Sequence, residues 1–76
     1  GMIAEGGGTM TNKRILSNKI KGLRVMRGLK QKDIAKKLEM NVGTYNGKEN
    51  GDFPFNIYEA LDLAKILGVS VDDIFL

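Results

Sequence analysis

The chain has 76 residues and a net charge of +3, and it contains neither cysteine nor histidine. This length suffices for one hydrophobic core and therefore for one domain. Without cysteine there is no disulfide framework and no thiolate metal site, and without histidine any acid–base catalysis would depend on carboxylates and lysines. We therefore predict that the protein is not an enzyme and that it uses no metal, no cofactor and no small-molecule substrate.

The charge is divided unevenly along the chain. Residues 13–37 carry ten of the twelve Lys and Arg residues and a single acid, Asp33, whereas residues 38–76 carry seven of the nine acids. A strongly basic stretch is typical of a surface that faces nucleic-acid phosphates. On charge alone, an ordinary solvated surface is an equally good interpretation.

The N-terminal residues have the composition of a flexible lead-in. Gly1 precedes Met2 and is interpreted as the remnant of a purification tag, and a run of glycines follows at residues 6–8. We predict a flexible segment over residues 1–14 and one domain over residues 15–76. No apolar run approaches the roughly 20 residues that cross a bilayer, and no signal peptide is evident. A cytoplasmic protein without membrane contact is expected.

The first predicted helix covers residues 18–27. Ile20 and Leu23 recur there at helical spacing after Ser17 and Asn18, which are both good N-caps, and a glycine then ends the pattern.

Two shorter helices are predicted next. Residues 31–38 place Ile34, Ala35 and Leu38 on one face with lysines opposite, which predicts a short amphipathic helix. A third helix is predicted over residues 42–49 even though it contains two glycines, each of which costs about 0.8–1 kcal/mol relative to alanine.

The last part of the chain has the clearest helix signals. Asn56 and Glu59 have the spacing of a capping box and precede an apolar periodic run that ends at Gly68. Ser70 can cap a final short helix over residues 71–75. With no strand candidate in the sequence, the predicted fold class is all-α, a compact bundle of five helices.

Four stretches of this sequence have a characteristic spacing: Gly28-Leu29-Lys30-Gln31-Lys32-Asp33-Ile34-Ala35, Thr44-Tyr45, Lys48-Glu49-Asn50-Gly51 and Leu63-Ala64-Lys65-Ile66-Leu67-Gly68-Val69-Ser70. Together they resemble the phage repressor and Cro type of helix-turn-helix regulator, the XRE-like family. The resemblance covers nearly everything after Asn18, and the spacing of its glutamine, alanine and Glu-Asn-Gly positions is its most specific part.

The resemblance implies a lambda-repressor-like DNA-binding fold in which the second and third helices form the helix-turn-helix. The third helix is then expected in the major groove, with its N-terminal residues at the base edges. Gln31, at the start of the second helix, is expected to contact the DNA backbone, where the helix dipole favours a phosphate oxygen. The residues implied in DNA binding are Lys30, Gln31, Lys32, Asn41, Val42, Gly43, Thr44, Asn46, Gly47 and Asn50.

The resemblance also implies one structural ion pair. Arg24 and Glu49 match the family's partly buried pair, which ties the first helix to the end of the recognition helix. Ala35 matches a position where the second and third helices approach closely, so that a small side chain is needed.

The predicted function is a sequence-specific DNA-binding transcriptional regulator, a small phage- or prophage-type repressor or Cro-like protein that binds double-stranded DNA as a homodimer. Among the expected outward residues of the third helix, only Asn46 offers a side chain suited to bidentate base contacts. This scarcity favours an alternative, in which the fold serves as an antitoxin- or anti-repressor-like protein-protein module. Phe75, Leu76, Phe53 and Phe55 could form a dimer surface or close the domain's own core.

Overall fold

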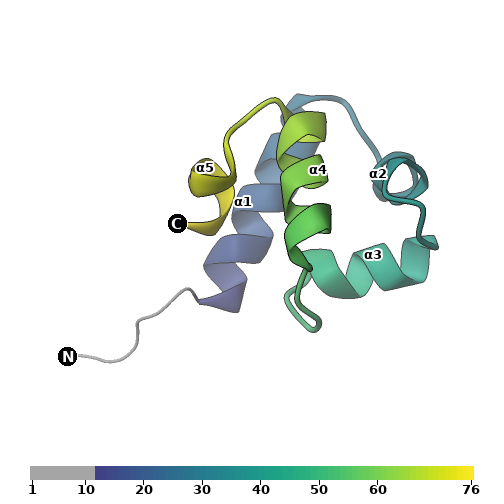
Figure 1. The fold of residues 1–76 in the computed structure, drawn as a ribbon, viewed down its shortest axis with the longest axis horizontal. Helices are drawn as coiled ribbons and strands as arrows, with labels where there is room; N and C mark the ends of the chain where they lie inside the picture. Colours follow the sequence, from purple (N-terminus) through teal and green to yellow (C-terminus); the bar gives the residue numbers. More distant parts are fainter. Residues whose placement is uncertain (1–11) are drawn as a thin grey trace.

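The computed structural model describes residues 12–76, and the chain forms five α-helices and no strand within this range. Figure 1 shows α1 and α4 between the α2–α3 pair on one side and the short α5 on the other. The all-α, five-helix prediction is confirmed. Of the predicted flexible segment, residues 1–14, residues 1–11 lie outside the described residues, whereas Lys13 and Arg14 belong to the first helix. The helices are α1 (Lys13–Met26), α2 (Gln31–Lys37), α3 (Val42–Glu49), α4 (Ile57–Leu67) and α5 (Val71–Phe75).

The start of α1 differs from the prediction. The helix begins at Lys13 rather than at residue 18, and its N-cap is Asn12, whose side-chain oxygen accepts a hydrogen bond of 2.7 Å from the backbone N–H of Arg14. Ser17, predicted as a cap, instead lies inside the helix and is buried. The helix extends upstream because Leu16 lies one turn before the fully buried Ile20 and packs against the core.

The other helix boundaries follow local signals. Asn41 caps α3 by accepting a 2.7 Å hydrogen bond from the backbone N–H of Thr44. The predicted capping box is present, since Asn56 and Glu59 exchange hydrogen bonds at the start of α4. Ser70 caps α5 as predicted, and it also exchanges hydrogen bonds with Asp73, which makes this cap a capping box as well.

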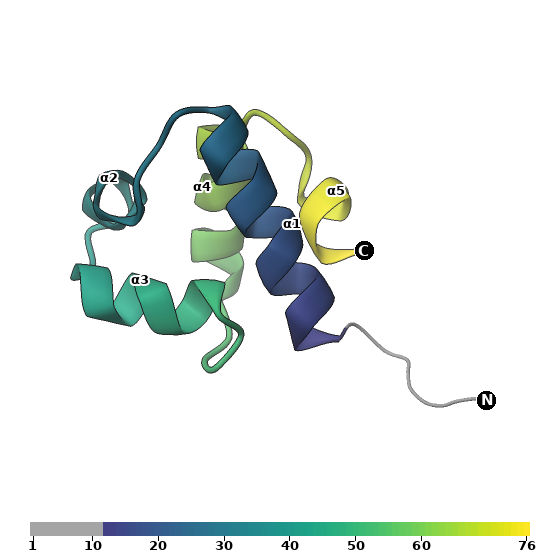
Figure 2. The same ribbon diagram turned by 180° about the vertical axis from the view of Figure 1, so that it is seen from behind.

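The core lies where all five helices meet. In both Figure 1 and Figure 2, α3 extends from near the lower end of α4 to below α2, while α5 lies beside α1 on the opposite side from α2. α3 contacts α2 and α1, and α5 contacts α1 and α4. The largest fully buried side chains are Ile20, Ile34, Tyr45, Glu49, Leu63, Leu67 and Ile74.

Phe53, Phe55, Phe75 and Leu76 were expected either to form a dimer surface or to close the core. In the structure, two of them close the core and two remain exposed. Phe55 and Phe75 are half-buried, and the ring of Phe55 lies 6.3 Å from that of Tyr45 and 6.0 Å from that of Phe75. These two rings close the core. Phe53 and Leu76 remain 61% and 89% exposed. None of the helices in residues 12–76 combines the length and the apolar character that crossing a bilayer requires.

An ion pair links the end of α3 to the start of α4. Lys48 Nζ lies 2.6 Å from Glu59 Oε1 and also donates to the carbonyl oxygen of Pro54 at 3.2 Å. Partial burial raises the pKa of the Glu59 carboxyl, but the hydrogen bonds from Lys48 and from the backbone N–H of Asn56 outweigh this effect and hold the pKa below its usual value of 4.5.

Replacing Glu59 with glutamine is expected to lower the free energy of unfolding at neutral pH. The variant should then lose less stability than the wild type when the solution is acidified. A lowered folded-state pKa contributes stability above pH 4.5, and this contribution disappears as the pH falls through the folded-state value. Glutamine retains an oxygen for the capping bond from Asn56 but loses the charge. The gap between wild type and Glu59→Gln, measured by urea unfolding, should therefore close between pH 7 and pH 3. An equal gap at both pH values would contradict the assignment, and Asp62→Asn, which removes an exposed charge from the same helix, is the control.

Candidate nucleic-acid interface

Helices α2 and α3 form the helix-turn-helix unit. Ile34 and Ala35 are buried between them and the rest of the core, and the backbone N–H of Met40 donates to the carbonyl oxygen of Ala35 at 3.0 Å, which closes the turn. The expectation that a small residue is needed at Ala35 agrees with its 2% exposure. The two helices therefore hold a fixed mutual orientation.

The structure brings most of the predicted DNA-binding residues to the surface of this unit. Gln31 and Asn50 are half-buried. The exposed members are Lys30, Lys32, Asn41, Val42, Gly43, Thr44 and Asn46.

Gly47 does not face outward as predicted. It is buried, and a Cβ added to it would lie 2.8 Å from Cδ2 of Phe53. The aromatic ring of the α3–α4 loop folds back over this position, so Gly47 provides space for Phe53 instead of a surface for a ligand. The resemblance to the family implies an outward position for residue 47, but it takes no account of the loop of this chain that returns across the helix.

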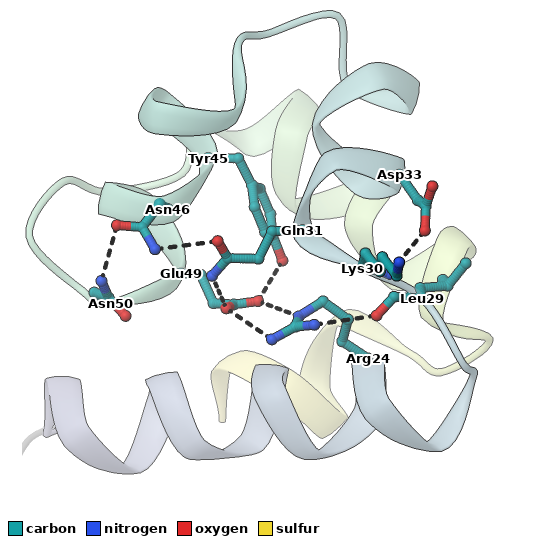
Figure 3. Close-up of polar contacts among 9 residues, drawn as sticks. All are labelled: Arg24, Leu29, Lys30, Gln31, Asp33, Tyr45, Asn46, Glu49 and Asn50. Carbon is teal, nitrogen blue, oxygen red and sulfur yellow. Dashed lines mark hydrogen bonds and ion pairs between the residues drawn. The ribbon is translucent and has the colours of Figure 1, made fainter.

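The predicted ion pair between Arg24 and Glu49 is present. Arg24 Nε lies 2.8 Å from Glu49 Oε1, and its Nη2 lies 3.4 Å from Oε2 (Figure 3). Arg24 Nη1 also donates to the carbonyl oxygen of Leu29 at 3.1 Å. The side chain of Glu49 is fully buried and that of Arg24 is 16% exposed, so the pair fastens α1 to both ends of the helix-turn-helix unit.

Tyr45 also contacts this ion pair, although it is not among the residues predicted from the sequence. Its hydroxyl donates to Glu49 Oε1 at 2.9 Å, one helical turn away. Burial raises the pKa of the Tyr45 phenol, and the neighbouring Glu49 carboxylate raises it further. The phenol thus stays protonated and keeps donating. The spacing of four residues between a tyrosine and a glutamate in one helix was the available signal.

Gln31 lies between the buried pair and the outer surface of α3. Its Nε2 donates to Glu49 Oε2 at 2.7 Å, and its Oε1 accepts from Asn46 Nδ2 at 3.1 Å. Asn50 Nδ2 in turn donates to Asn46 Oδ1 at 3.2 Å. The amide of Gln31 was expected to contact a phosphate, but in this structure both of its ends are bonded within the protein.

The exposed cations of the helix-turn-helix unit lie on and just before α2. On and before α2, four exposed lysines form no ion pair with any carboxylate of residues 12–76. Beyond the end of α3, charges are paired, since Lys13 Nζ lies 3.5 Å from Asp52 Oδ1. The four lysines are Lys30, Lys32, Lys36 and Lys37.

Glu39 occupies the turn between α2 and α3 in a left-handed conformation, with φ at +58°. A side chain costs about 1–2 kcal/mol in this region, whereas glycine adopts it freely. Glu39→Gly is therefore expected to raise the free energy of unfolding by up to about 1 kcal/mol after its greater unfolded-state entropy is counted. Glu39→Gln removes the charge but retains the strain and should leave the melting temperature near wild type. Equal thermal stability of Glu39→Gly and Glu39→Gln would contradict this account.

Comparisons with known proteins agree with the geometry. The family described as Helix-turn-helix matches residues 20–74, which include all of α2 to α4. An uncharacterized HTH-type transcriptional regulator of Methanocaldococcus jannaschii is 36% identical over 61 residues, which are 80% of this chain and 92% of the relative. No solved structure matches the chain significantly. The prediction that the chain is not an enzyme is confirmed by this family match, and the chain belongs to the helix-turn-helix family.

Proposed function

We propose that this protein is a sequence-specific transcriptional regulator that binds double-stranded DNA, of the small phage- or prophage-type repressor or Cro kind. The observation that carries the proposal is the exposed surface of α3 together with four exposed lysines on and before α2 that pair with no carboxylate of residues 12–76. The family match and the regulator from Methanocaldococcus jannaschii support it. A regulator of this kind works in the compartment that contains the DNA, which agrees with the cytoplasmic location predicted from the sequence.

In this proposal α3 enters the major groove, and the start of α2 meets the sugar-phosphate backbone. The exposed side chains of Val42, Thr44 and Asn46 then lie toward the bases or the adjoining phosphates. Lys30 and Lys32 neutralise phosphates, which supplies affinity without selecting a sequence. The buried pair beneath keeps α3 at a fixed angle to α2.

Binding of random duplex fragments, followed by fluorescence anisotropy across a salt series, tests the proposal. Neutralised phosphates make the logarithm of the binding constant fall linearly with the logarithm of salt, with a slope of about 0.9 for each phosphate. A Lys30→Gln, Lys32→Gln, Lys36→Gln variant should bind more weakly and with a shallower slope. Lys65→Gln, which removes an exposed charge from the last turn of α4, outside the helix-turn-helix unit, should change neither. No binding by the folded protein at about 50 mM salt would refute the proposal.

We also propose that the protein binds DNA as a homodimer through its α1–α5 surface. Two adjoining hollows there share Lys19, and exposed apolar side chains of Ile15, Met26 and Leu76 lie in or beside them. Lys19 and Asp73 both line this surface, so a two-fold arrangement can place Lys19 of one copy against Asp73 of the other. Such a pairing makes an isologous contact self-complementary.

Sedimentation equilibrium distinguishes this dimer from a monomer. Met26→Glu and Leu76→Glu together place charges on exposed positions and should shift the mass toward that of one chain. Tyr58→Glu, equally exposed on α4, should leave the mass unchanged. A wild-type protein that stays monomeric at high concentration and on its DNA site would refute the dimer.

A second candidate function is a protein-protein module of the antitoxin or anti-repressor kind. It is favoured by the exposed apolar side chains of Ile57, Tyr58 and Leu61 on α4, together with the small number of base-reading side chains on α3. This module would read an operator weakly or not at all, so the absence of DNA binding in the salt series would favour it over the regulator.

A further inference from the structure

Three side-chain amides form a hydrogen-bonded series across the surface of the helix-turn-helix unit. It begins at the buried carboxylate of Glu49 and passes through Gln31 and Asn46 to Asn50 (Figure 3). Glu49 is fully buried, whereas Asn46 is exposed. The series therefore connects a fixed charge in the core to a side chain on the outer surface of α3.

The buried carboxylate determines the orientation of every amide in the series. An ionised carboxylate only accepts hydrogen bonds, so Gln31 must present its Nε2 to Glu49 and its Oε1 to Asn46. Asn46 must then present Nδ2 to Gln31, which leaves Oδ1 to accept from Asn50. A reversed Asn46 amide would place two oxygens together on one side and two NH2 groups together on the other.

The same two hydrogen bonds also determine which donor and which acceptor of Asn46 remain available for a ligand. An amide has two N–H donors and two oxygen lone pairs, and the series uses one of each. One donor and one acceptor are left on a single exposed side chain. Adenine offers a complementary pair in the major groove, the N7 acceptor and the N6 amino donor.

Neighbouring residues of α3 do not offer this combination. Val42 and Gly43 have no side-chain hydrogen-bonding groups, and the side-chain oxygen of Asn41 already caps the helix. Thr44 has a single short hydroxyl group. Asn46 is therefore the position of α3 where a base can be distinguished by two simultaneous hydrogen bonds.

We infer that Asn46 reads an adenine in the major groove and that Gln31 and Asn50 are positioning residues that hold its amide in the orientation for this contact. The inference rests on the proposed DNA-binding function and names the base on which its specificity depends. Because the orientation is set before DNA arrives, no rotation of the Asn46 amide is needed on binding.

Selection of sites from a pool of randomised duplexes, carried out with wild type and Asn46→Ala, tests the inference. Wild type should select adenine at one position in each half-site. Asn46→Ala should lower the preference for adenine at that position by about 5- to 150-fold, the range of one bidentate base contact. Preferences at the other positions should persist, and Thr44→Ala, a matched truncation on the same helix, should retain the adenine preference.

A test of the positioning role needs a variant that retains Asn46. Asn50→Ala removes the donor to Asn46 Oδ1 without touching Glu49, and it should reduce the adenine preference while the fold, checked by circular dichroism, persists. In the free protein, nuclear Overhauser contacts should place the Asn46 NH2 group against Gln31. Contacts that place it against Asn50 instead would show the opposite orientation and overturn the positioning role.

The outcomes separate this inference from the function on which it rests. Wild-type protein without any sequence preference would refute both. Clear sequence preference in wild type, with the same preference at every position in Asn46→Ala, would leave the regulator function standing and overturn the reading of adenine by Asn46.

Discussion

Replacing Arg24 with alanine is expected to lower the free energy of unfolding by about 3–5 kcal/mol, because the variant leaves the Glu49 carboxylate buried without its cation. Gln31 and the Tyr45 hydroxyl still donate to this carboxylate, but both are neutral groups. A domain of this size has a total stability of only about 5–15 kcal/mol. Urea unfolding followed by circular dichroism measures the loss, which should appear as a shift of the unfolding midpoint to a lower urea concentration.

Two further variants make this prediction specific. Arg14→Ala removes an exposed arginine from the same helix and should change stability little. Combining Arg24→Ala with Glu49→Gln should recover part of the loss, since a neutral amide is less costly to bury than an unpaired charge. A melting temperature of Arg24→Ala equal to that of wild type would show that the pair does not stabilise the fold.

The second large effect is expected at Gly51, where α3 gives way to the loop before α4. Its φ is +85°, a conformation that side chains rarely adopt, and a Cβ there would lie 2.7 Å from Cβ of Lys13. Gly51→Ala therefore combines backbone strain with a steric overlap against α1, and a loss of about 2–4 kcal/mol is expected. Thermal unfolding provides the measurement.

Gly22→Ala is the matched control for this substitution. No atom lies within 4 Å of the Cβ that it would add, and Gly22 lies within α1. Because alanine favours a helix over glycine by about 0.8–1 kcal/mol, this variant should be more stable than wild type. Similar effects of the two substitutions would mean that the close approach between Gly51 and α1 is not real.

Local sequence signals were sufficient for most of the fold. The capping box at Asn56 and the cap at Ser70 both depend on residues within one turn of the helix start, so each can be predicted without knowing anything outside the segment. The start of α1 was missed because Ser17 and Asn18 are acceptable caps, while the choice of Asn12 depends on the burial of Ser17 and the contact of Leu16 with the core.

The candidate site was predicted less completely because it depends on contacts between elements. The Arg24–Glu49 pair followed from a family resemblance, but the series from Gln31 to Asn50 requires the crossing of α2 over α3 to be known. Gly47 was misplaced for the same reason, since the ring of Phe53 arrives from the next loop.

The position of Tyr45 gives the protein an internal optical reporter. The sequence contains two tyrosines and no tryptophan, and Tyr58 is 75% exposed in the folded chain. Intrinsic fluorescence therefore combines a signal from solvent with a signal from the carboxylate-bonded phenol of Tyr45. Because Tyr45 is fully buried, its surroundings change far more than those of Tyr58 when the chain unfolds, so the fluorescence of an unlabelled sample reports mainly on the contact that joins α1, α2 and α3.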